Sequence, residues 1–551
     1  MKQYIILSIV ICCLYSHVSY TKSNFEHVFN KGCTAFHHSN HAKAIHYFKK
    51  TIDLSPHCFQ AYYNLGLIHE LKEEYTQAID YFLKALTVNP TYTKPHINLA
   101  TIYYKQEQFA LAKKHYQQAL ITDPQNSTAH HHLGKIFLEE TILDQCIYHF
   151  EMACSLESQN VHMLLDLANA KNMANQTEDA LRLYFRIDAL LPNNPSILYN
   201  IAYTFKKLGR LQEAMPFYQR VLTINPDHAE AHFSYGLALL LTGNWNDGWK
   251  EYEWRWTRNE RSTFPHFNKP MWDGSDLHGK TIYLRAEQGL GDTFQFVRYA
   301  KVAKDKGGKV IVAVQQPLLP YMKLLPYADL VISVHDTPPS FDVYAALVSC
   351  PMILGTDIDT VPVDIPYLPA DESLVHEWRN KLSHDKQFKI GICWQGNPNY
   401  STHFLRMAVA AKSMPLDYFI PLFSIPGTSF YCLQLKTGTD QLHQLKDKSQ
   451  LTIFDEQFDV LHGNFMDSAA VIKNLDLVIT IDTSTGHFAA GLGVKTWVLL
   501  PEPPDWRWML DRTDTPWYPN MKLFRQPKPG DWQSVMDTVA TELITLLDMH
   551  S

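Results

Sequence analysis

Two short glycine-containing segments hold most of the residues in this sequence whose types and spacing could do chemistry. Residues 287–293 read Glu-Gln-Gly-Leu-Gly-Asp-Thr, and residues 482–487 read Asp-Thr-Ser-Thr-Gly-His. Backbone amides in a glycine-rich turn can face an anion, and amides and hydroxyls at a helix N-terminus suit a diphosphate. The two segments therefore predict a binding site for a ligand that carries phosphate groups.

Each segment also has a simpler structural interpretation. Asp292 stands where its side chain would cap the helix that follows the first turn, because an aspartate there accepts hydrogen bonds from free amides. His487 lies in the first turn of the second helix. There it would bond either a phosphate or sugar hydroxyl of a ligand, or only its own neighbours. Both interpretations stay open at the level of sequence.

The elements around both segments alternate between short β-rich runs and helical stretches. The runs form two sets, namely residues 281–285, 309–314 and 329–334, then residues 388–394, 429–434, 475–481 and 496–500. This alternation predicts two Rossmann-like lobes, each built on a parallel sheet. Ligands of such folds bind at the carboxyl ends of the strands, which is where both segments lie.

Together the two segments resemble the heptosyltransferase family of GT-B glycosyltransferases. In that family a Gly-Asp turn follows the first strand, and a segment Asp-Thr-Gly-x-x-His-x-Ala-Ala serves the nucleotide sugar. The second motif here reads Asp-Thr-Ser-Thr-Gly-His-Phe-Ala-Ala, with Ser484 in place of the usual glycine. Residues 504–508 and 514–519 also look like segments of bacterial proteins that join helical repeats to this transferase type. The resemblance implies an inverting, metal-independent enzyme with no cofactor besides a nucleotide-diphosphate sugar as co-substrate.

The resemblance also implies roles for individual residues. Asp292 matches the general base that takes a proton from the acceptor hydroxyl, and Glu287 is a second candidate for this role. Positive side chains must offset the charge of the leaving diphosphate, and Lys412, Arg406 and Arg507 are candidates. The residues expected to bind the donor are Gly289, Gly291, Lys412, Arg406, Asp482, Thr483, Ser484, Thr485, Gly486, His487 and Arg507.

The N-terminal part of the chain follows a different period, of 34 residues. Prolines recur at this spacing or twice it, at Pro56, Pro90, Pro124, Pro192 and Pro226. Small residues recur at the same period, at Gly32, Gly66, Ala100, Gly134, Ala168, Ala202 and Gly236. Aromatic residues follow them at Phe48, Phe82, Tyr116, Phe150, Tyr184, Tyr218 and Tyr252. The pattern resembles the tetratricopeptide repeat (TPR), best in residues 59–92, and predicts about seven helical hairpins.

The groove of a TPR array binds peptide segments or partner proteins in that family, and the resemblance implies the same here. The alternative is that the array only braces the C-terminal domain or forms a dimer surface. Trp245, Trp249, Trp254 and Trp256 end the array. We expect them to cap it by packing on the next domain, because an open terminal repeat would leave apolar surface in water.

The expected fold class is α + α/β, a TPR α-solenoid followed by a GT-B module of two Rossmann-like lobes. The uncharged stretch 4–16 has the shape of a signal-peptide core. Three locations therefore stay open: association with the cytoplasmic face of a membrane through this stretch, export, and the cytoplasm. The expected domains are a signal-peptide-like or membrane-tether segment at 1–22, the array at 24–257, a linker at 258–278, the acceptor lobe at 279–385 and the donor lobe at 386–549.

Composition argues against two other classes of protein. A net charge of -7 gives no basic surface for nucleic acid, so we expect no nucleic-acid partner. The nine cysteines include no Cys-x-x-Cys pair, and the 27 histidines show no metal-site spacing. We therefore expect no metal.

Three functions are compatible with these features. The first is transfer of a sugar from a nucleotide-diphosphate donor to a protein or glycan acceptor, with the TPR groove selecting the acceptor or a partner. The second is a protein O-linked N-acetylglucosamine-type transferase, whose catalytic-lobe motifs we do not find. The third is a non-catalytic TPR scaffold with a degenerate transferase fold. Asp292, Asp482, Thr483 and His487 all stand at the predicted ligand loops, which favours the first.

Overall fold

The computed structural model of the chain describes residues 24–258, 267–399, 403–445 and 451–549. The predicted signal-like or tether segment at 1–22 lies outside the described residues, as does part of the predicted linker. The chain divides into two compact units, one ending at Pro192 and the other beginning at Asn193. No described helix combines the length and the hydrophobicity needed to cross a bilayer.

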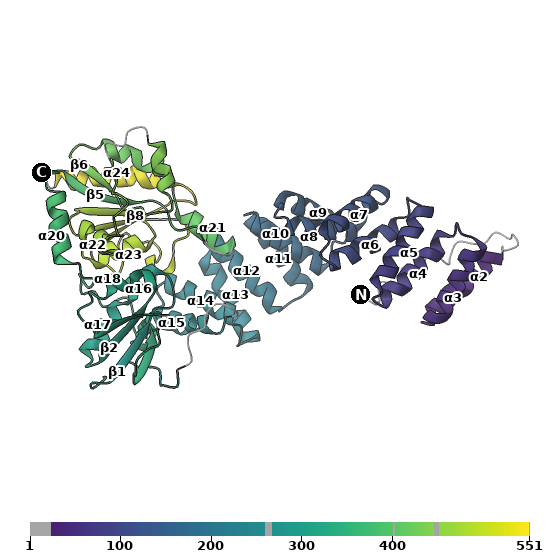
Figure 1. Cartoon of the computed structure of the whole chain (residues 1–551), viewed down its shortest axis with the longest axis horizontal. Helices are drawn as coiled ribbons and strands as arrows, with labels where there is room; N and C mark the ends of the chain where they lie inside the picture. Colours follow the sequence, from purple (N-terminus) through teal and green to yellow (C-terminus); the bar gives the residue numbers. More distant parts are fainter. Residues whose placement is uncertain (1–23, 259–266, 400–402, 446–450, 550–551) are drawn as a thin grey trace. The chain divides into compact units, whose positions relative to one another are not determined.

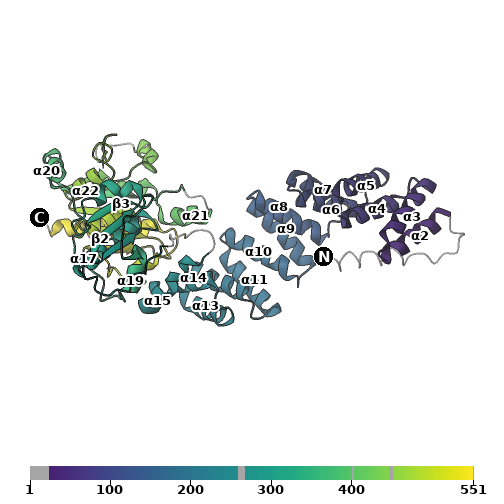
Figure 2. The ribbon, with the colours of Figure 1, turned by 60° about the horizontal axis from the view of Figure 1, so that its bottom comes forward.

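The first unit is a row of helical hairpins (Figure 1). Each hairpin packs on the next, so that helices adjacent in sequence lie side by side (Figure 2). The helices are α2 (Asn24–His37), α3 (His41–Leu54), α4 (Phe59–Leu71), α5 (Tyr75–Val88), α6 (Thr93–Lys105), α7 (Phe109–Thr122), α8 (Ser127–Glu139), α9 (Leu143–Leu156), α10 (Val161–Met173) and α11 (Thr177–Leu190).

The repeated small and aromatic residues explain how each hairpin closes. A methyl group added at Gly134 would lie 2.5 Å from Cδ1 of Phe150, so the glycine lets the two helices approach across the ring. Gly66 has the same relation to Phe82. The turn inside each hairpin holds a residue with positive φ at the same period, at Ser39, Glu73, Glu107, Thr141 and Asn175. The 34-residue pattern therefore predicted the hairpins correctly.

The second unit begins with two more hairpins. They are formed by α12 (Pro195–Lys207), α13 (Leu211–Ile224), α14 (Ala229–Leu241) and α15 (Trp245–Tyr252), and a 3-10 turn, η2 (Glu253–Trp256), follows. Glycines take the positive-φ positions in these two turns, at Gly209 and Gly243. The last hairpins thus share one compact unit with the sheets that follow them.

Two all-parallel sheets make up the rest of this unit, which confirms the α + α/β fold class. The first has the order β3-β2-β1-β4, with β1 (Thr281–Arg285), β2 (Lys309–Val314), β3 (Leu330–Ser333) and β4 (Val343–Ala346). The second has the order β10-β9-β8-β5-β6-β7, with β5 (Phe388–Cys393), β6 (Thr428–Cys432), β7 (Leu451–Thr452), β8 (Leu477–Ile481), β9 (Thr496–Leu500) and β10 (Met521–Arg525). Strands β4, β7 and β10 had not been predicted.

Helices and 3-10 turns connect these strands. In the first lobe they are α16 (Leu290–Phe296), α17 (Arg298–Asp305), η3 (Gln316–Leu318), α18 (Leu319–Met322), η4 (Leu347–Ser349) and α19 (Cys350–Ile353). Helix α20 (Glu372–Lys381) precedes the strands of the second lobe in the chain and packs on that lobe, although the predicted boundary placed it in the first. In the second they are α21 (His403–Lys412), η5 (Leu416–Ser424), η6 (Thr439–Gln444), α22 (Met466–Ile472), α23 (Ser484–Gly491), η7 (Trp506–Trp508) and α24 (Trp532–Asp548).

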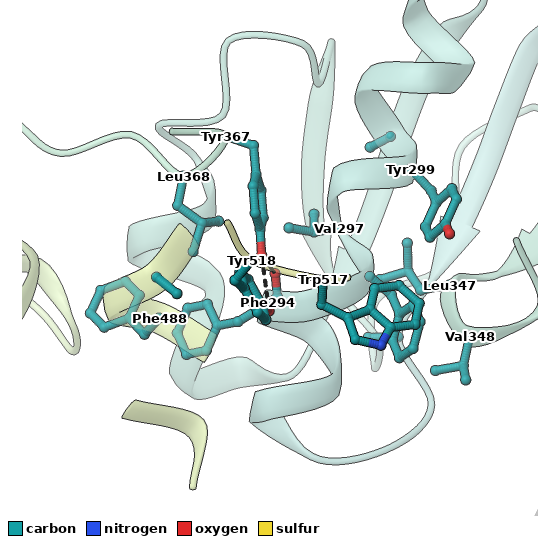
Figure 3. Packing of buried hydrophobic residues seen from close by; sticks show 14 of the residues in the cluster. Phe294, Val297, Tyr299, Leu347, Val348, Tyr367, Leu368, Phe488, Trp517 and Tyr518 are labelled. Atoms are coloured by element: carbon teal, nitrogen blue, oxygen red, sulfur yellow. Dashed lines mark hydrogen bonds between the residues drawn. The ribbon is translucent and has the colours of Figure 1, made fainter. Parts of the chain in front are cut away.

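One hydrophobic core joins the last hairpin to both lobes (Figure 3). Trp245 and Trp249 are buried, and the ring of Trp245 stacks on that of Trp517 with centroids 5.0 Å apart. The indole N–H of Trp249 donates to the carbonyl of Thr356 at 2.9 Å. These two tryptophans cap the array on the sheets, as predicted. Trp254 instead stacks on His232 of the array.

Candidate functional site

The two segments predicted to bind a ligand lie against each other at the carboxyl ends of their strands. Residues 287–293 follow β1 and run into α16, while residues 482–487 follow β8 and open α23. The rings of Phe294 on α16 and Phe488 on α23 stack with centroids 4.5 Å apart (Figure 3). A methyl group at Gly291 would lie 3.2 Å from Cδ2 of His487 and 3.4 Å from Cα of Ser484. The fold therefore brings both segments into one site.

Asp292 is a helix cap that also meets a cation from the second lobe. Its Oδ2 accepts a hydrogen bond from the amide of Gly289 at 2.8 Å. Gly289 is the N-cap residue and Asp292 stands three residues later, so the side chain does cap the helix, but not from the N-cap position that was predicted. Its Oδ1 pairs with Nη2 of Arg507, which comes from η7. Nη1 of Arg507 also binds Asp505 at 2.8 Å, and its Nε donates to Oε1 of Gln295 at 2.8 Å. The carboxylate thus has two partners and still keeps some exposed surface, as a group that meets a substrate would.

Glu287 is buried more deeply than Asp292. Its side chain is 8% exposed, and its Oε1 accepts from Nη2 of Arg255 at 3.3 Å. Its other oxygen, Oε2, has no hydrogen-bond partner among the described residues. Burial raises the pKa of Glu287 to about 7, although the charge of Arg255 opposes this rise. Glu287 is therefore a carboxyl group that changes its charge near neutral pH.

The raised pKa of Glu287 predicts a pH-dependent stability. The folded state holds this proton more tightly than the unfolded chain, where the pKa is near 4.5, so the stabilisation is complete below that value. The free energy of unfolding should then fall by about 3 kcal/mol in total as pH rises through about 7. Urea unfolding of the wild type and Glu287→Gln between pH 4 and pH 8.5 should show this extra fall only in the wild type. Parallel pH profiles would contradict it.

The second segment combines a buried carboxylate with hydroxyl groups at the start of α23. Asp482 is buried, which raises its pKa, and Nζ of Lys412 lies 3.8 Å from its Oδ2. Thr483 is the N-cap residue, and its hydroxyl is 3.1 Å from that of Thr480. The hydroxyl of Thr485 donates to Sγ of Cys393 at 3.6 Å. This arrangement places a cation and a helix N-terminus at the carboxyl end of strand β8 in the second sheet.

The remaining residues that were predicted to bind the donor lie at the starts of α16 and α23 and on α21. Ser484 is the first residue of α23, and Gly486 faces Thr480, since a methyl group there would lie 3.3 Å from its Cγ2. Gly289 is the N-cap residue of α16. Arg406 lies earlier than Lys412 on α21, with an exposed side chain.

His487 is the centre of a buried aromatic group. Its Nδ1 is 2.9 Å from the hydroxyl of Tyr518, and its ring stacks on Trp508 with centroids 5.3 Å apart. Burial, together with the charges of Arg507 and Arg298, lowers its pKa well below 6.5. The imidazole is therefore neutral at physiological pH. The side chain of His487 is held by its protein neighbours Tyr518 and Trp508, which is the structural one of its two interpretations. These contacts also fix the ring beside Gly291.

A polar network that the sequence did not reveal joins this histidine to the first lobe. The hydroxyl of Tyr518 lies 3.3 Å from that of Tyr367, which donates to the carbonyl of Phe294 at 2.8 Å (Figure 3). Arg298 donates to the Tyr367 hydroxyl at 3.1 Å and to the carbonyl of Trp517 at 2.8 Å. These residues are far apart in the chain. Trp517 and Tyr518 belong to the segment 514–519 singled out in the sequence, whereas no motif marks Arg298 or Tyr367. They lock the two lobes together beside the candidate site.

No group of three or more histidine, cysteine, aspartate or glutamate residues is arranged to hold a metal ion in the described part of the chain. The charges around the site come instead from Arg507, Lys412 and Arg255 and from the carboxylates that they meet. The site therefore combines fixed positive groups, three carboxylates of different burial (Asp292, Asp482 and Glu287) and a helix N-terminus.

Comparison with known proteins identifies the repeats. The family model described as tetratricopeptide repeat matches residues 59–92 and 195–228, and a second model of that description matches residues 94–126. The chain is 25% identical over 380 residues to Protein FlbA of Caulobacter vibrioides, which covers 64% of this chain and 62% of FlbA. It is 33% identical over 101 residues to Protein O-mannosyl-transferase tmtc2 of Xenopus laevis, covering 17% of this chain and 12% of that protein. The chain thus spans less than two thirds of either relative.

Two of the solved structures that match are described as TPR proteins. YrrB, described as a TPR protein with an unusual peptide-binding site, is 18% identical with a TM-score of 0.33, covering 34% of this chain and 96% of YrrB. The C-terminal part of a TPR repeat-containing protein from Cytophaga hutchinsonii is 16% identical with a TM-score of 0.34, covering 41% of this chain and 93% of that one. The matched repeat models and the hairpins agree, so the chain carries an N-terminal TPR solenoid ahead of its two parallel-sheet lobes.

Proposed function

We propose that this protein is a glycosyltransferase that moves a sugar from a nucleotide-diphosphate donor to a protein or glycan acceptor. The observation that carries the proposal is the meeting of residues 287–293 and 482–487 at the carboxyl ends of two parallel sheets, with Arg507 between them. Such sheet edges are where α/β folds bind ligands. The relative tmtc2 is a protein O-mannosyl-transferase, which is the same class of reaction, and its match covers 17% of this chain.

The proposed reaction uses Asp292 as general base. Its carboxylate takes the proton from an acceptor hydroxyl as that oxygen attacks the anomeric carbon of the donor sugar. The bond from this carbon to the diphosphate oxygen breaks, with inversion, and the nucleoside diphosphate leaves with the electron pair. Arg507, Lys412 and the N-terminus of α23 offset its charge, so that the reaction needs no metal ion and no further cofactor.

The array supplies protein recognition in this proposal. A TPR solenoid implies binding of a protein or peptide segment, and the last hairpin is packed directly on the two lobes. An acceptor held in the repeats would thereby be kept near the transferase site. The proposed function thus gives both parts of the chain a role in one reaction.

Binding of the donor is expected to depend on His487. Replacing it with alanine removes the ring that lies against Gly291 and the bond to Tyr518, so the start of α23 loses its fixed position. Titration calorimetry with UDP, GDP and ADP should find one nucleotide that the wild type binds and that His487→Ala binds at least ~10-fold more weakly, a loss of about 1.4 kcal/mol.

His443→Ala is a matched control, because His443 is an exposed histidine on η6 of the same lobe. It should bind the nucleotide as the wild type does. Circular dichroism of the free variants would confirm that both remain folded. Equal nucleotide affinity in His487→Ala and the wild type would reject the placement of the donor site.

A further inference from the structure

The loop after β1 is held from one side by the end of the repeat array. The Tyr252 hydroxyl, from the last helix of the array, lies 3.2 Å from Oε1 and 2.9 Å from Nε2 of Gln288. The guanidinium of Arg255, in the turn that follows, reaches Glu287. Two adjacent residues of the candidate catalytic loop therefore take their partners from the array.

Arg255 is built into this position by a buried network. Its side chain is 6% exposed, and its guanidinium also pairs with Glu253 and donates from Nη2 to Oγ of Ser349 at 2.6 Å. The hydroxyl of Ser349 donates in turn to Oε2 of Glu253 at 2.8 Å. The ring of Trp256 covers the guanidinium at 4.3 Å. Such a network fixes the side chain far more firmly than a surface ion pair would.

The charge around Glu287 explains what this cation can do. The ionisable groups that act on Glu287 are Glu253 and Arg255 from η2, Asp292 from α16 and Cys350 from α19. Arg255 is the cation among these groups, and it faces two carboxylates. The ionised form of Glu287 is favoured most by the charge of Arg255, and less by a backbone hydrogen bond with Val348.

We propose that the end of the repeat array is part of the transferase site, with Arg255 as the positioning residue that keeps Glu287 ionised behind Asp292 and Tyr252 fixing Gln288 beside it. The proposal rests on the transferase function proposed above. The charges of Glu287 and Asp292 act on each other, so the ionisation of Glu287 changes the electrostatic field at the proposed base. The array would then contribute to the chemistry itself, in addition to binding a protein.

The test is the pH dependence of kcat/KM for sugar transfer in the full chain. Arg255→Met removes the cation, so Glu287 should stay protonated to a higher pH, and the acid limb should move up by about 1 pH unit or more. At pH 6 this is a loss of ~10-fold, which should fade toward pH 9. Arg255→Lys keeps a charge and should restore most of the wild-type profile.

Arg258→Met is the matched control. Arg258 also ends the array, but its Nε binds Glu230 at 2.8 Å and its guanidinium lies over Phe233, away from the loop. The acid limb of the pH profile of Arg258→Met should coincide with that of the wild type. An unmoved acid limb in Arg255→Met, or an equal shift in Arg258→Met, would overturn the proposal.

A second measurement separates this proposal from the function on which it rests. Urea unfolding would give the unfolding equilibrium constants of Arg255→Met, Glu287→Gln and the double variant. The change in this constant for the double variant should differ at least ~5-fold from the product of the changes in the two single variants. An additive cycle overturns the contact itself. A wild-type chain that transfers no sugar overturns the transferase function and the catalytic part of this proposal, whatever the cycle shows.

Discussion

Replacing Asp292 with asparagine is expected to lower the turnover of sugar transfer by ~10²- to 10⁴-fold while leaving donor affinity near normal. An amide cannot take the proton of the acceptor hydroxyl. Its oxygen can still accept the hydrogen bond from the amide of Gly289, so the start of α16 is kept. Steady-state kinetics with a saturating donor, together with titration of the donor, measure the two effects separately.

Asparagine at position 292 also removes a negative charge that pairs with Arg507, and this effect needs its own control. Asp505→Asn likewise removes a negative partner of Arg507, since Asp505 binds Nη1 of that residue at 2.8 Å. Asp505 has no proposed part in proton transfer, so this variant should keep turnover within ~10-fold of the wild type. A large and equal loss in both variants would show that Asp292 acts only through Arg507. Unchanged turnover in Asp292→Asn would reject it as the base.

Replacing Trp517 with alanine is expected to destabilise the second unit by about 3–5 kcal/mol. This side chain is fully buried (Figure 3). It packs on Trp245 of the array and Phe296 of the first lobe. Removing it leaves a large cavity where the array meets both lobes. Urea unfolding followed by tryptophan fluorescence would measure the loss, and it should appear in the transition of the second unit.

A thermodynamic cycle with Trp245→Ala tests whether the array is coupled to the lobes. The rings of Trp245 and Trp517 stack, so the double variant should differ from the sum of the single losses by 0.5 kcal/mol or more, in line with residues in contact, for which the coupling is typically ~0.5–3 kcal/mol. Additive losses, or a loss below about 1 kcal/mol in Trp517→Ala, would mean that the last hairpin is not held by this contact.

The repeating patterns in the sequence predicted most of the fold. The 34-residue repeat of small and aromatic residues predicted the hairpins, because Gly32, Gly66 and Gly134 lie against the aromatic rings that the period supplies. The β-rich runs gave most of the strands. Strand β7 has two residues and β4 reads Val-Tyr-Ala-Ala, so neither shows a hydrophobic pattern long enough to be recognised.

The site was predicted where local sequence defines it. The two loops predicted to bind a ligand were chosen from their glycines, their hydroxyls and their position after a strand, and the structure brings these loops together. The partners of Glu287 and His487 could not be found in this way. Arg255 precedes Glu287 by a whole linker, and Tyr518 follows His487 after strand β9 and turn η7, so only the packing of the lobes makes them neighbours.

The aromatic end of the array shows the same limit in one segment. Its tryptophans were interpreted as a cap, and for Trp245 and Trp249 this is confirmed. Arg255 lies between such residues and had no assigned role, because an arginine among tryptophans is equally consistent with a surface position. Its pairing with Glu287 follows from the turn η2, which directs the guanidinium to the loop after β1.

The most direct test of the proposed function is the release of nucleoside diphosphate from UDP-, GDP- and ADP-linked sugars by the full chain. Chromatography of the products, with the wild type and Asp292→Asn in parallel, would follow it. We expect the wild type to release the diphosphate from the sugars of one nucleotide, and the variant to release it at least ~100-fold more slowly. No release from any donor, by a wild-type chain that also binds none of the three nucleotides, would contradict the proposed function and favour a scaffold.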